Sequence, residues 1–303
     1  MFAPADFESA ASAISPLRQE ALFYTMVIMS SRMKLNEAEK IEKESSQLEF
    51  RCIVTGFNGF GPNTENPSQL VAQNLPIAVS FPRTGEVKIT SLVLPTCCSQ
   101  AWDILKTHLK RKSKVRNIVI LTGLAAKRDR INLERMSVNV RDYAIKDSGG
   151  HKYDGKSIDD GPLALKTDAP LFDFRRKLQA AGFPTVISNH AGTFVCNDVY
   201  YRSLFFQLKH GSPDLVLFVH VPRLMKFRKT VQIEGNQKTR ALAEAARTRT
   251  KQIELMQAAI IEVIKASVSY LTEIEAAERR GRAKSTSTRS SSRTATQRTK
   301  KLR

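Results

Sequence analysis

The sequence predicts an α/β fold built on a largely parallel, buried β-sheet, and two observations carry this prediction. From Arg51 onward, short apolar runs of strand composition alternate with segments of helical composition, which is the pattern of βαβ units. The chain also has 303 residues, of which 42% are hydrophobic, enough to bury a large core in one or two domains. The same numbers exclude a wholly disordered chain.

Six apolar runs are predicted as strands because they are short, rich in strand-forming residues and bounded by polar or turn-forming residues. In chain order they are CIVTGF (52–57), VKITSLVL (87–94), NIVILTG (117–123), ERMSVNVRDYAI (134–145), TVIS (185–188) and LVLFVHV (215–221).

Helices are predicted between these strands, over 66–75, 99–110, 171–181 and 193–209. The first has a good start, since the Asn66 side chain can cap free N–H groups and Pro67 loses no needed donor at the first helical position. A last helix is expected over 252–271, where apolar residues recur at helical spacing and can cover one face of the sheet.

The sequence divides into three parts. Residues 1–48 are expected to be an appendage, partly helical or disordered, because their apolar stripe is thin. Residues 49–271 are expected to form a single α/β domain with a basic insertion near 223–250. Residues 272–303 are basic and rich in Ser, Thr and Arg, so they have almost nothing to bury and are predicted to be disordered.

The net charge of +19 raises the question of a nucleic-acid or other polyanionic partner. Ten Lys and Arg residues and no acidic residue lie between Arg279 and Arg303. This tail has no aromatic residues to stack on bases, so any nucleic-acid binding is expected to be weak, non-specific and salt-dependent. A solvated tail without a partner is the favoured interpretation.

The four cysteines are Cys52, Cys97, Cys98 and Cys196, and no two of them have CxxC spacing. The spacing therefore predicts neither a metal nor a redox site, and no cofactor is expected. Free cysteines without a convincing signal peptide favour a cytoplasmic protein. The best apolar stretch, 21–29, is too short to cross a membrane, and no membrane partner is expected.

Three residues indicate nucleophilic chemistry. Cys196 lies where a predicted strand gives way to a helix, and the free N–H groups of a helix start stabilise a thiolate. His220 ends an apolar strand, where the active sites of open α/β sheets gather. Glu134 begins a strand-like run, and a carboxylate there can orient an imidazole. Each also has a structural explanation: a buried thiol, a satisfied core histidine and an exposed carboxylate.

Five ordered motifs resemble the pyroglutamyl peptidase I family, also called pyrrolidone carboxyl peptidases. They are VTGFNGFGPNTENPSQLVAQNL (54–75), INLERMSVNVRDYAIKDSGG (131–150), SIDDGPLALKTDAP (157–170), HAGTFVCNDVYYRSLF (190–205) and LVLFVHVP (215–222). The resemblance implies a three-layer α/β/α sandwich that is commonly a homo-oligomer. It implies a cysteine peptidase that removes an N-terminal pyroglutamyl residue from peptides through a thioester acyl-enzyme. In that resemblance Cys196 is the nucleophile, His220 the base and acid, and Glu134 the orienting carboxylate.

The resemblance also implies a pocket for the pyroglutamyl ring. Phe57 and Phe60 match the family's pocket phenylalanines, and Phe194 matches an aromatic position just before the nucleophile. Core packing is the alternative role for these three rings. Asn66 matches an asparagine near the substrate, although capping of the following helix explains it as well.

The chain departs from the family pattern at several positions. Leu124 stands where the family has a glutamine, Ala144 stands where it usually has an arginine, and Asn58-Gly59 replaces an acidic residue and a proline. Two alternatives to a pyroglutamyl peptidase therefore stay open. One is the same fold with altered or lost substrate specificity, and the other is a non-catalytic member whose basic tail binds polyanions.

Overall fold

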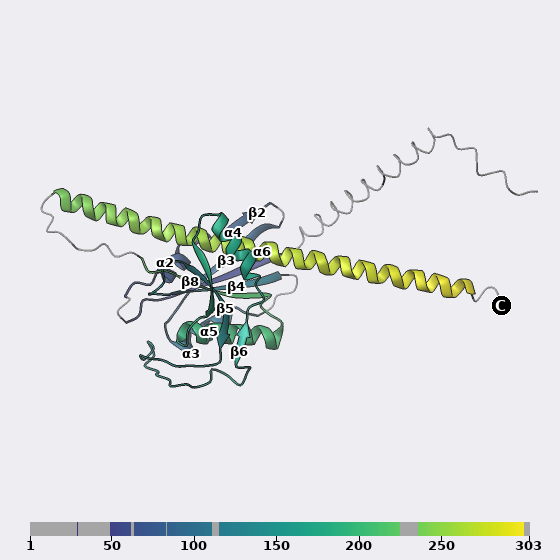
Figure 1. Cartoon of the computed structure of the whole chain (residues 1–303), viewed down its shortest axis with the longest axis horizontal. Helices are drawn as coiled ribbons and strands as arrows, with labels where there is room; N and C mark the ends of the chain where they lie inside the picture. The colour runs from purple at the N-terminus through teal and green to yellow at the C-terminus, as the bar shows by residue number, and fades with distance from the viewer. Residues whose placement is uncertain are drawn as a thin grey trace, which may run out of the picture. The chain divides into compact units, whose positions relative to one another are not determined.

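The computed structural model describes residues 29, 49–61, 64–82, 84–110, 115–224 and 236–299, with the side chains of the last range described from 247 to 280. The chain separates into two units, Met1–Gln47 and Leu48–Arg303. The architecture belongs to the second unit (Figure 1). Apart from Met29, the appendage expected over 1–48 lies outside the described residues.

An eight-stranded sheet forms the centre of the second unit, in the order β2-β3-β1-β4-β8-β5-β6, with β7 paired to β5. The strands are β1 (Glu49–Phe57), β2 (Ala78–Phe81), β3 (Gly85–Leu94), β4 (Val115–Leu124), β5 (Ile131–Val138), β6 (Ala164–Lys166), β7 (Thr185–His190) and β8 (Leu215–Val221). β3, β1, β4 and β8 run parallel to one another, and so do β5 and β7. β2 is antiparallel to β3, and β5 is antiparallel to both β6 and β8. The predicted mostly parallel sheet is confirmed.

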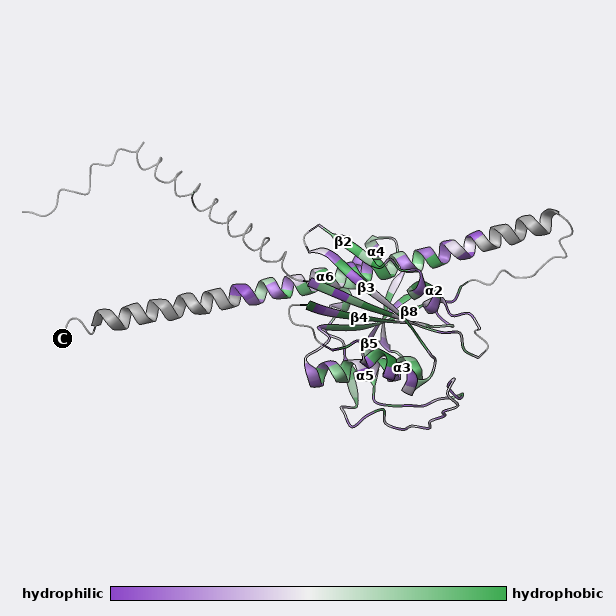
Figure 2. Cartoon of the chain, turned by 180° about the vertical axis from the view of Figure 1, so that it is seen from behind, coloured by the Kyte–Doolittle hydropathy of each residue, from purple (hydrophilic) through white to green (hydrophobic). Residues whose placement is uncertain are grey.

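Helices cover both faces of this sheet. On one face α2 (Pro67–Gln73), α4 (Leu171–Ala180) and α6 (Asn236–Thr299) share a core cluster with β1, β3, β4, β5 and β8. On the other face α3 (Cys98–Lys106) and α5 (Val195–His210) share a second cluster with the strands. Figure 1 shows the two groups of helices on opposite sides of the sheet, and Figure 2 shows that the strands between them are largely hydrophobic. The α/β/α sandwich is therefore confirmed.

The structure corrects the strand predicted over 134–145. β5 begins at Ile131 and ends at Val138, because the chain leaves the sheet at Asn139. The Asn139 side chain accepts the N–H groups of Ile158 and Asp159 and donates to the carbonyls of Asp159 and Gly161. These bonds hold the chain in a loop, although its apolar and polar residues alternate as in a strand. β2 and β6 were missed because strands of four and three residues are too short to show a period.

The structure also differs from the disorder expected after residue 271. Helix α6 runs from Asn236 to Thr299, so much of the expected basic insertion (223–250) and of the expected tail (272–303) is helical. Each residue added to an existing helix gains one hydrogen bond, so the segment that packs on the sheet can propagate the helix in both directions. The division of the chain at residues 49 and 271 remains a prediction.

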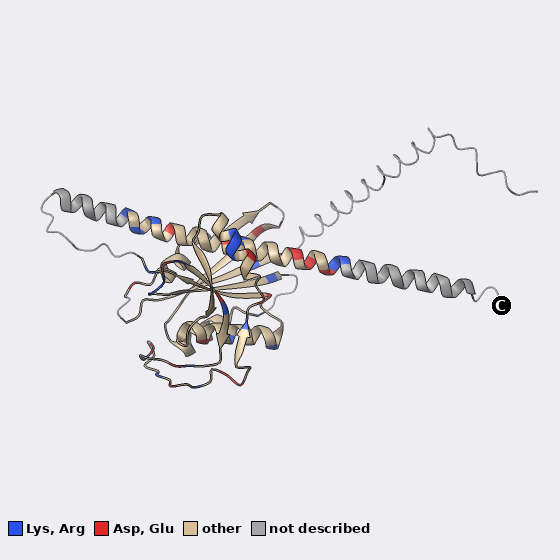
Figure 3. Cartoon of the chain, in the orientation of Figure 1, with Lys and Arg blue, Asp and Glu red and all other residues tan. Residues whose placement is uncertain are grey.

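The middle of α6 is a core helix. Residues Met256, Ile260, Val263 and Ile264 are buried at helical spacing and belong to the cluster beneath the sheet. The stretch Arg247–Arg280 is long and apolar enough to cross a membrane, but half of its most apolar window is buried inside the protein. Figure 3 shows charged residues on this helix before and after its middle part. Packing on the sheet therefore explains its hydrophobicity.

We expect Ile260→Ala to lower the free energy of unfolding by about 2–5 kcal/mol, because it leaves a cavity between α6 and the sheet. Leu255→Ala on the same helix is the matched control, since Leu255 is 52% exposed and should change stability much less. Urea unfolding followed by circular dichroism measures both. Equal losses for the two variants would contradict the packing of α6 on the sheet.

Candidate active site

Glu134 and His220 form a buried pair where β5 runs antiparallel to β8. In this register Glu134 lies opposite Phe218, so His220 is its diagonal neighbour on the same face of the sheet. The imidazole Nδ1 lies 2.7 Å from Glu134 Oε1, and both side chains are buried. A carboxylate at this distance fixes the ring orientation and leaves the other nitrogen, Nε2, for proton transfer.

Arg128 shares the same carboxylate oxygen. Its guanidinium Nη1 lies 2.6 Å from Glu134 Oε1 and approaches from the turn between β4 and β5. Glu134 Oε2 has no hydrogen-bond partner among the described residues. A fully buried carboxylate is costly without counter-charges, and Arg128 supplies one. Arg128 was not among the residues predicted from the sequence, although a basic residue in a strand-end turn just before Glu134 was an available signal.

Cys196 is the second residue of α5, and the surrounding sequence fixes the start of this helix. Gly192 has a φ of 85°, a left-handed conformation that favours glycine in the turn before the helix. Asn197 binds the end of β5 through four hydrogen bonds, to Ser137, Val138 and the Val140 carbonyl. These contacts hold the first turn of α5, and with it the thiol, against the sheet.

Gly123 leaves room for the Cys196 thiol at the edge of the sheet where His220 lies. It pairs with His220 in the register of β4 and β8, near the carboxyl ends of both strands. A Cβ atom at this position would lie 3.0 Å from Cys196 Sγ and 2.9 Å from the Phe218 ring. The missing side chain therefore lets the sulfur approach β4 closely. Cys196, His220 and Glu134, predicted from separate motifs, gather at one edge of the sheet, as expected for an open α/β fold.

The protonation state of Cys196 differs from the expectation that the helix start holds a thiolate. Burial raises the pKa of the Cys196 thiol to about 12, and the negative charge of Glu134 adds to the rise. The N–H of Cys196 itself acts in the opposite direction, but with a smaller effect. These surroundings therefore favour the neutral thiol, although the side chain is partly accessible.

A cavity of about 440 Å³ opens beside Cys196. Its lining includes all four side chains predicted to contact substrate, namely Phe57, Phe60, Asn66 and Phe194. The rings of Phe60 and Phe194 lie 6.0 Å apart at an interplanar angle of 30°. The cavity thus has flat apolar walls next to a nucleophile, which suits a small ring-shaped group.

Asn66 has a structural role as well as a place in the cavity. Its Oδ1 accepts the N–H of Ser68, which caps α2, and also the Ser68 hydroxyl. Its Nδ2 donates to the Asn58 carbonyl at 3.3 Å. The capping role weighed in the sequence analysis is therefore present.

The remaining cavity wall comes from loops and from the end of β4. Leu124 and Ala144, two of the positions where the chain departs from the resembled pattern, both line it and present apolar surface. The cavity is also lined by residues that were not predicted from the sequence, namely Thr96, Ala126, Asp142, Ile145 and Thr193. Asp142, Ile145 and Thr193 belong to two of the ordered motifs, but their positions there indicated no role. The five residues reach the cavity from the loops after β3, β4 and β5 and from the turn before α5.

Among the described residues, one group of potential metal ligands was found. It consists of Cys97, Asp147 and His151, none of which lines the cavity beside Cys196.

Comparisons with known proteins agree with these features. Residues 50–263 match the family profile described as pyroglutamyl peptidase. The pyrrolidone-carboxylate peptidase of Pyrococcus furiosus is 34% identical over 173 residues, which cover 57% of this chain and 80% of the relative. The enzyme of that name from Bacillus mycoides is also 34% identical over 173 residues, 57% of this chain and 78% of the relative.

Solved structures with the same fold are also known. A crystal structure of pyrrolidone carboxyl peptidase from Pyrococcus furiosus matches with a TM-score of 0.58 and 27% identity, covering 73% of this chain and 99% of that one. Pyroglutamyl peptidase I from Bacillus amyloliquefaciens matches with a TM-score of 0.53 and 29% identity, covering 66% and 96%.

The raised pKa of Cys196 predicts how the free thiol reacts. Its alkylation by iodoacetamide should still accelerate as the pH rises past 9, because only the thiolate reacts and it forms only at high pH. Peptide mass spectrometry measures the rate, with Cys196→Ser identifying the modified peptide. Glu134→Gln should shift the profile to lower pH, since it removes a charge that raises this pKa. A rate that is already constant below pH 8 would contradict the buried neutral thiol.

Proposed function

Because the chain belongs to the pyroglutamyl peptidase family, we propose that it removes an N-terminal pyroglutamyl residue from peptides, with Cys196 as nucleophile. His220 acts as general base and acid, and Glu134 orients its ring. The single observation that supports this best is the cavity in which Cys196 stands beside the aromatic side chains predicted to contact substrate. The buried pair of Glu134 and His220 at the same edge of the sheet supplies the proton-transfer groups.

The reaction starts from a neutral thiol. As Cys196 Sγ attacks the carbonyl carbon that joins pyroglutamate to the next residue, its proton passes to His220 Nε2. The carboxylate of Glu134 stabilises the imidazolium that forms. His220 then protonates the leaving amine, which departs and leaves a thioester on Cys196. Water, deprotonated by His220, attacks the thioester carbonyl carbon; the C–S bond breaks, pyroglutamate is released, and His220 returns the proton to Cys196 Sγ.

The start of α5 provides the oxyanion site. The carbonyl of Phe194 accepts the N–H of Asp198, so the N–H groups of residues 195–197 precede the helical ladder and have no acceptor within the helix. Donors of this kind, aimed at the developing negative charge, contribute about 3 kcal/mol to transition-state stabilisation. The dipole of the helix acts in the same direction.

The cavity suits the pyroglutamyl ring by shape and polarity. Pyroglutamate is a neutral, flat lactam, and the rings of Phe60 and Phe194 offer apolar surfaces on which it can pack. The centroid of the Tyr143 ring lies 4.6 Å from that of the Phe194 ring, so Tyr143 packs against Phe194. Leu124 replaces the family's glutamine in this wall, so fewer side-chain donors and acceptors face the lactam amide.

The proposed function also implies a class of partner, an oligomeric state and a cellular location. We propose peptides with an N-terminal pyroglutamate as its partners and a homo-oligomeric state like that of the family. A reducing cytoplasmic location is supported by four cysteines that are all free.

Purified protein should release aminomethylcoumarin from pyroglutamyl-aminomethylcoumarin, as measured by fluorescence. Cys196→Ser and His220→Ala should each lower kcat by at least about a thousand-fold, because the triad acts as a unit. Cys52→Ala is the matched control, since this thiol lies in the core on the other face of the sheet and should leave kcat within about two-fold. Wild-type activity no higher than that of Cys196→Ser would overturn the proposed function.

Leu124→Gln should improve recognition of the ring by restoring an amide beside it. A new hydrogen bond of about 1 kcal/mol corresponds to a roughly five-fold lower KM for the pyroglutamyl substrate. The prolyl substrate is the control, because its ring lacks the lactam carbonyl and should gain nothing. A panel of acyl-aminocoumarins on the wild type tests the alternative of altered specificity. Preference for another acyl group, with no gain from Leu124→Gln, would favour that alternative.

A further inference from the structure

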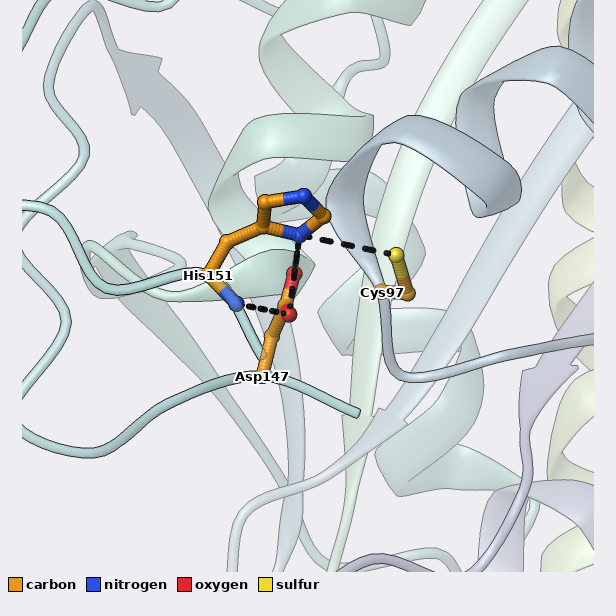
Figure 4. A group of neighbouring side chains, drawn as sticks. All are labelled: Cys97, Asp147 and His151. Carbon is orange, nitrogen blue, oxygen red and sulfur yellow. Dashed lines mark hydrogen bonds and ion pairs between the residues drawn. The ribbon is translucent and has the colours of Figure 1, made fainter. Parts of the chain in front are cut away.

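Cys97, Asp147 and His151 form a compact cluster outside the proposed catalytic triad. Figure 4 shows the thiol and the carboxylate converging on the same ring nitrogen of His151. His151 Nδ1 lies 3.9 Å from Cys97 Sγ, and 3.1 and 3.3 Å from the two oxygens of Asp147. One ligand atom from each residue lies within 4.8 Å of the others. Cys97 and Asp147 are buried, whereas the His151 side chain is 44% exposed.

This convergence argues against a second nucleophilic triad. A triad uses both ring nitrogens, one to orient the imidazole on a carboxylate and the other to take the thiol proton. Here both partners face Nδ1. Nδ1 can donate a proton to the carboxylate or accept one from the thiol, but it cannot do both. A bound cation would satisfy the thiolate, the carboxylate and the nitrogen lone pair together.

The donor set points to zinc. Thiolate, imidazole and carboxylate are the ligands that Zn²⁺ takes in proteins, whereas Ca²⁺ and Mg²⁺ prefer oxygen alone. A tetrahedral zinc ion with Zn–S of about 2.3 Å and Zn–N of about 2.0 Å holds these two atoms about 3.5 Å apart, and it holds nitrogen and oxygen about 3.4 Å apart. The distances of 3.9 Å and 3.1–3.3 Å therefore need shifts of only a few tenths of an ångström.

The surroundings of the cluster fit a metal site. Asp147 accepts the N–H groups of Cys98, Gly149 and His151, and these bonds hold its carboxylate in place beside the other two residues. Such hydrogen bonds orient metal-binding carboxylates. A Cβ atom on Gly149 would lie 2.7 Å from Cys97 Sγ and 3.0 Å from His151 Nδ1, so glycine keeps the space between these two ligands open.

We propose that Cys97, Asp147 and His151 bind one Zn²⁺ ion, with water as the fourth ligand on the exposed side of His151. The ion binds the Cys97 thiolate after the thiol proton is released to solvent, and it binds the Nδ1 lone pair while the ring proton stays on Nε2. The site joins two segments of the cavity wall. Thr96 precedes Cys97 and lines the cavity, as do Ala144 and Ile145 shortly before Asp147. A bound zinc ion would therefore link these two segments of the cavity wall.

The test uses Cys196→Ser protein, so that the active-site thiol cannot bind the metal. After dialysis against a chelator, titration calorimetry with Zn²⁺ should show one bound equivalent. Adding Cys97→Ala or His151→Gln should weaken that affinity at least about 100-fold, since each removes a ligand. Adding Cys98→Ala, which removes the neighbouring thiol, should leave it unchanged. With Co²⁺, the thiolate-to-metal charge-transfer band should be present in the parent and absent after Cys97→Ala.

Two results would overturn the proposal. One is that the Cys196→Ser protein binds no zinc. The other is that the bound equivalent persists in both the Cys97→Ala and the His151→Gln variants. His151 is partly exposed, so its variant decides the matter if circular dichroism shows that Cys97→Ala has lost its fold. Metal binding is read directly, so this outcome does not depend on peptidase activity.

Discussion

The antiparallel pairing of β5 with β8 is the constraint on which the site depends. The strands β3, β1, β4 and β8 are parallel, and β5 reverses direction at the edge of this group. That reversal sets Glu134 opposite Phe218 and one diagonal step from His220. The carboxylate and the imidazole consequently lie on the same face of the sheet. Both are buried there, so water does not compete for the hydrogen bond between them. Helix α5 then needs only to present a thiol at the same edge.

Burying a carboxylate in this position carries an energetic cost, and the structure offsets it locally. Desolvation of an ion costs several kcal/mol unless counter-charges and hydrogen bonds replace water. Arg128 and His220 share one oxygen of Glu134, while the other has no partner among the described residues. Burial, together with this negative charge, raises the pKa of the Cys196 thiol and favours its neutral form. The electrostatics thus favour a nucleophile that loses its proton during attack rather than beforehand.

The sequence alone was sufficient to predict an element wherever its local hydrophobic pattern agrees with its surroundings in the fold. All seven residues of β8 are buried, so its continuous apolar run could be recognised directly. Cys196, His220 and Glu134 could be named from motifs, but their meeting depends on strand order, which periodicity does not encode. Gly123 was missed for that reason, since it matters only through Cys196, which lies far along the chain. Arg128 lies only six residues before Glu134, but its contact with that carboxylate depends on the turn between β4 and β5. The length of α6 was underestimated because helix propagation from a packed segment overrides the weak signal of a polar sequence.

The loop after β5 shows why the hardest segment to predict carries much of the function. Apolar and polar residues alternate in this loop as in a strand. Nevertheless, hydrogen bonds to the Asn139 side chain hold the chain out of the sheet, and the Asp147 carboxylate accepts three backbone N–H groups. Side-chain hydrogen bonds thus replace a strand partner, which frees the backbone to follow the rim of the cavity. Asp142, Ala144 and Ile145 consequently reach the cavity wall, while His151 turns back toward Cys97. Because polar side chains hold this loop, changes in it can alter pocket shape while the sheet that positions Glu134 and His220 stays intact.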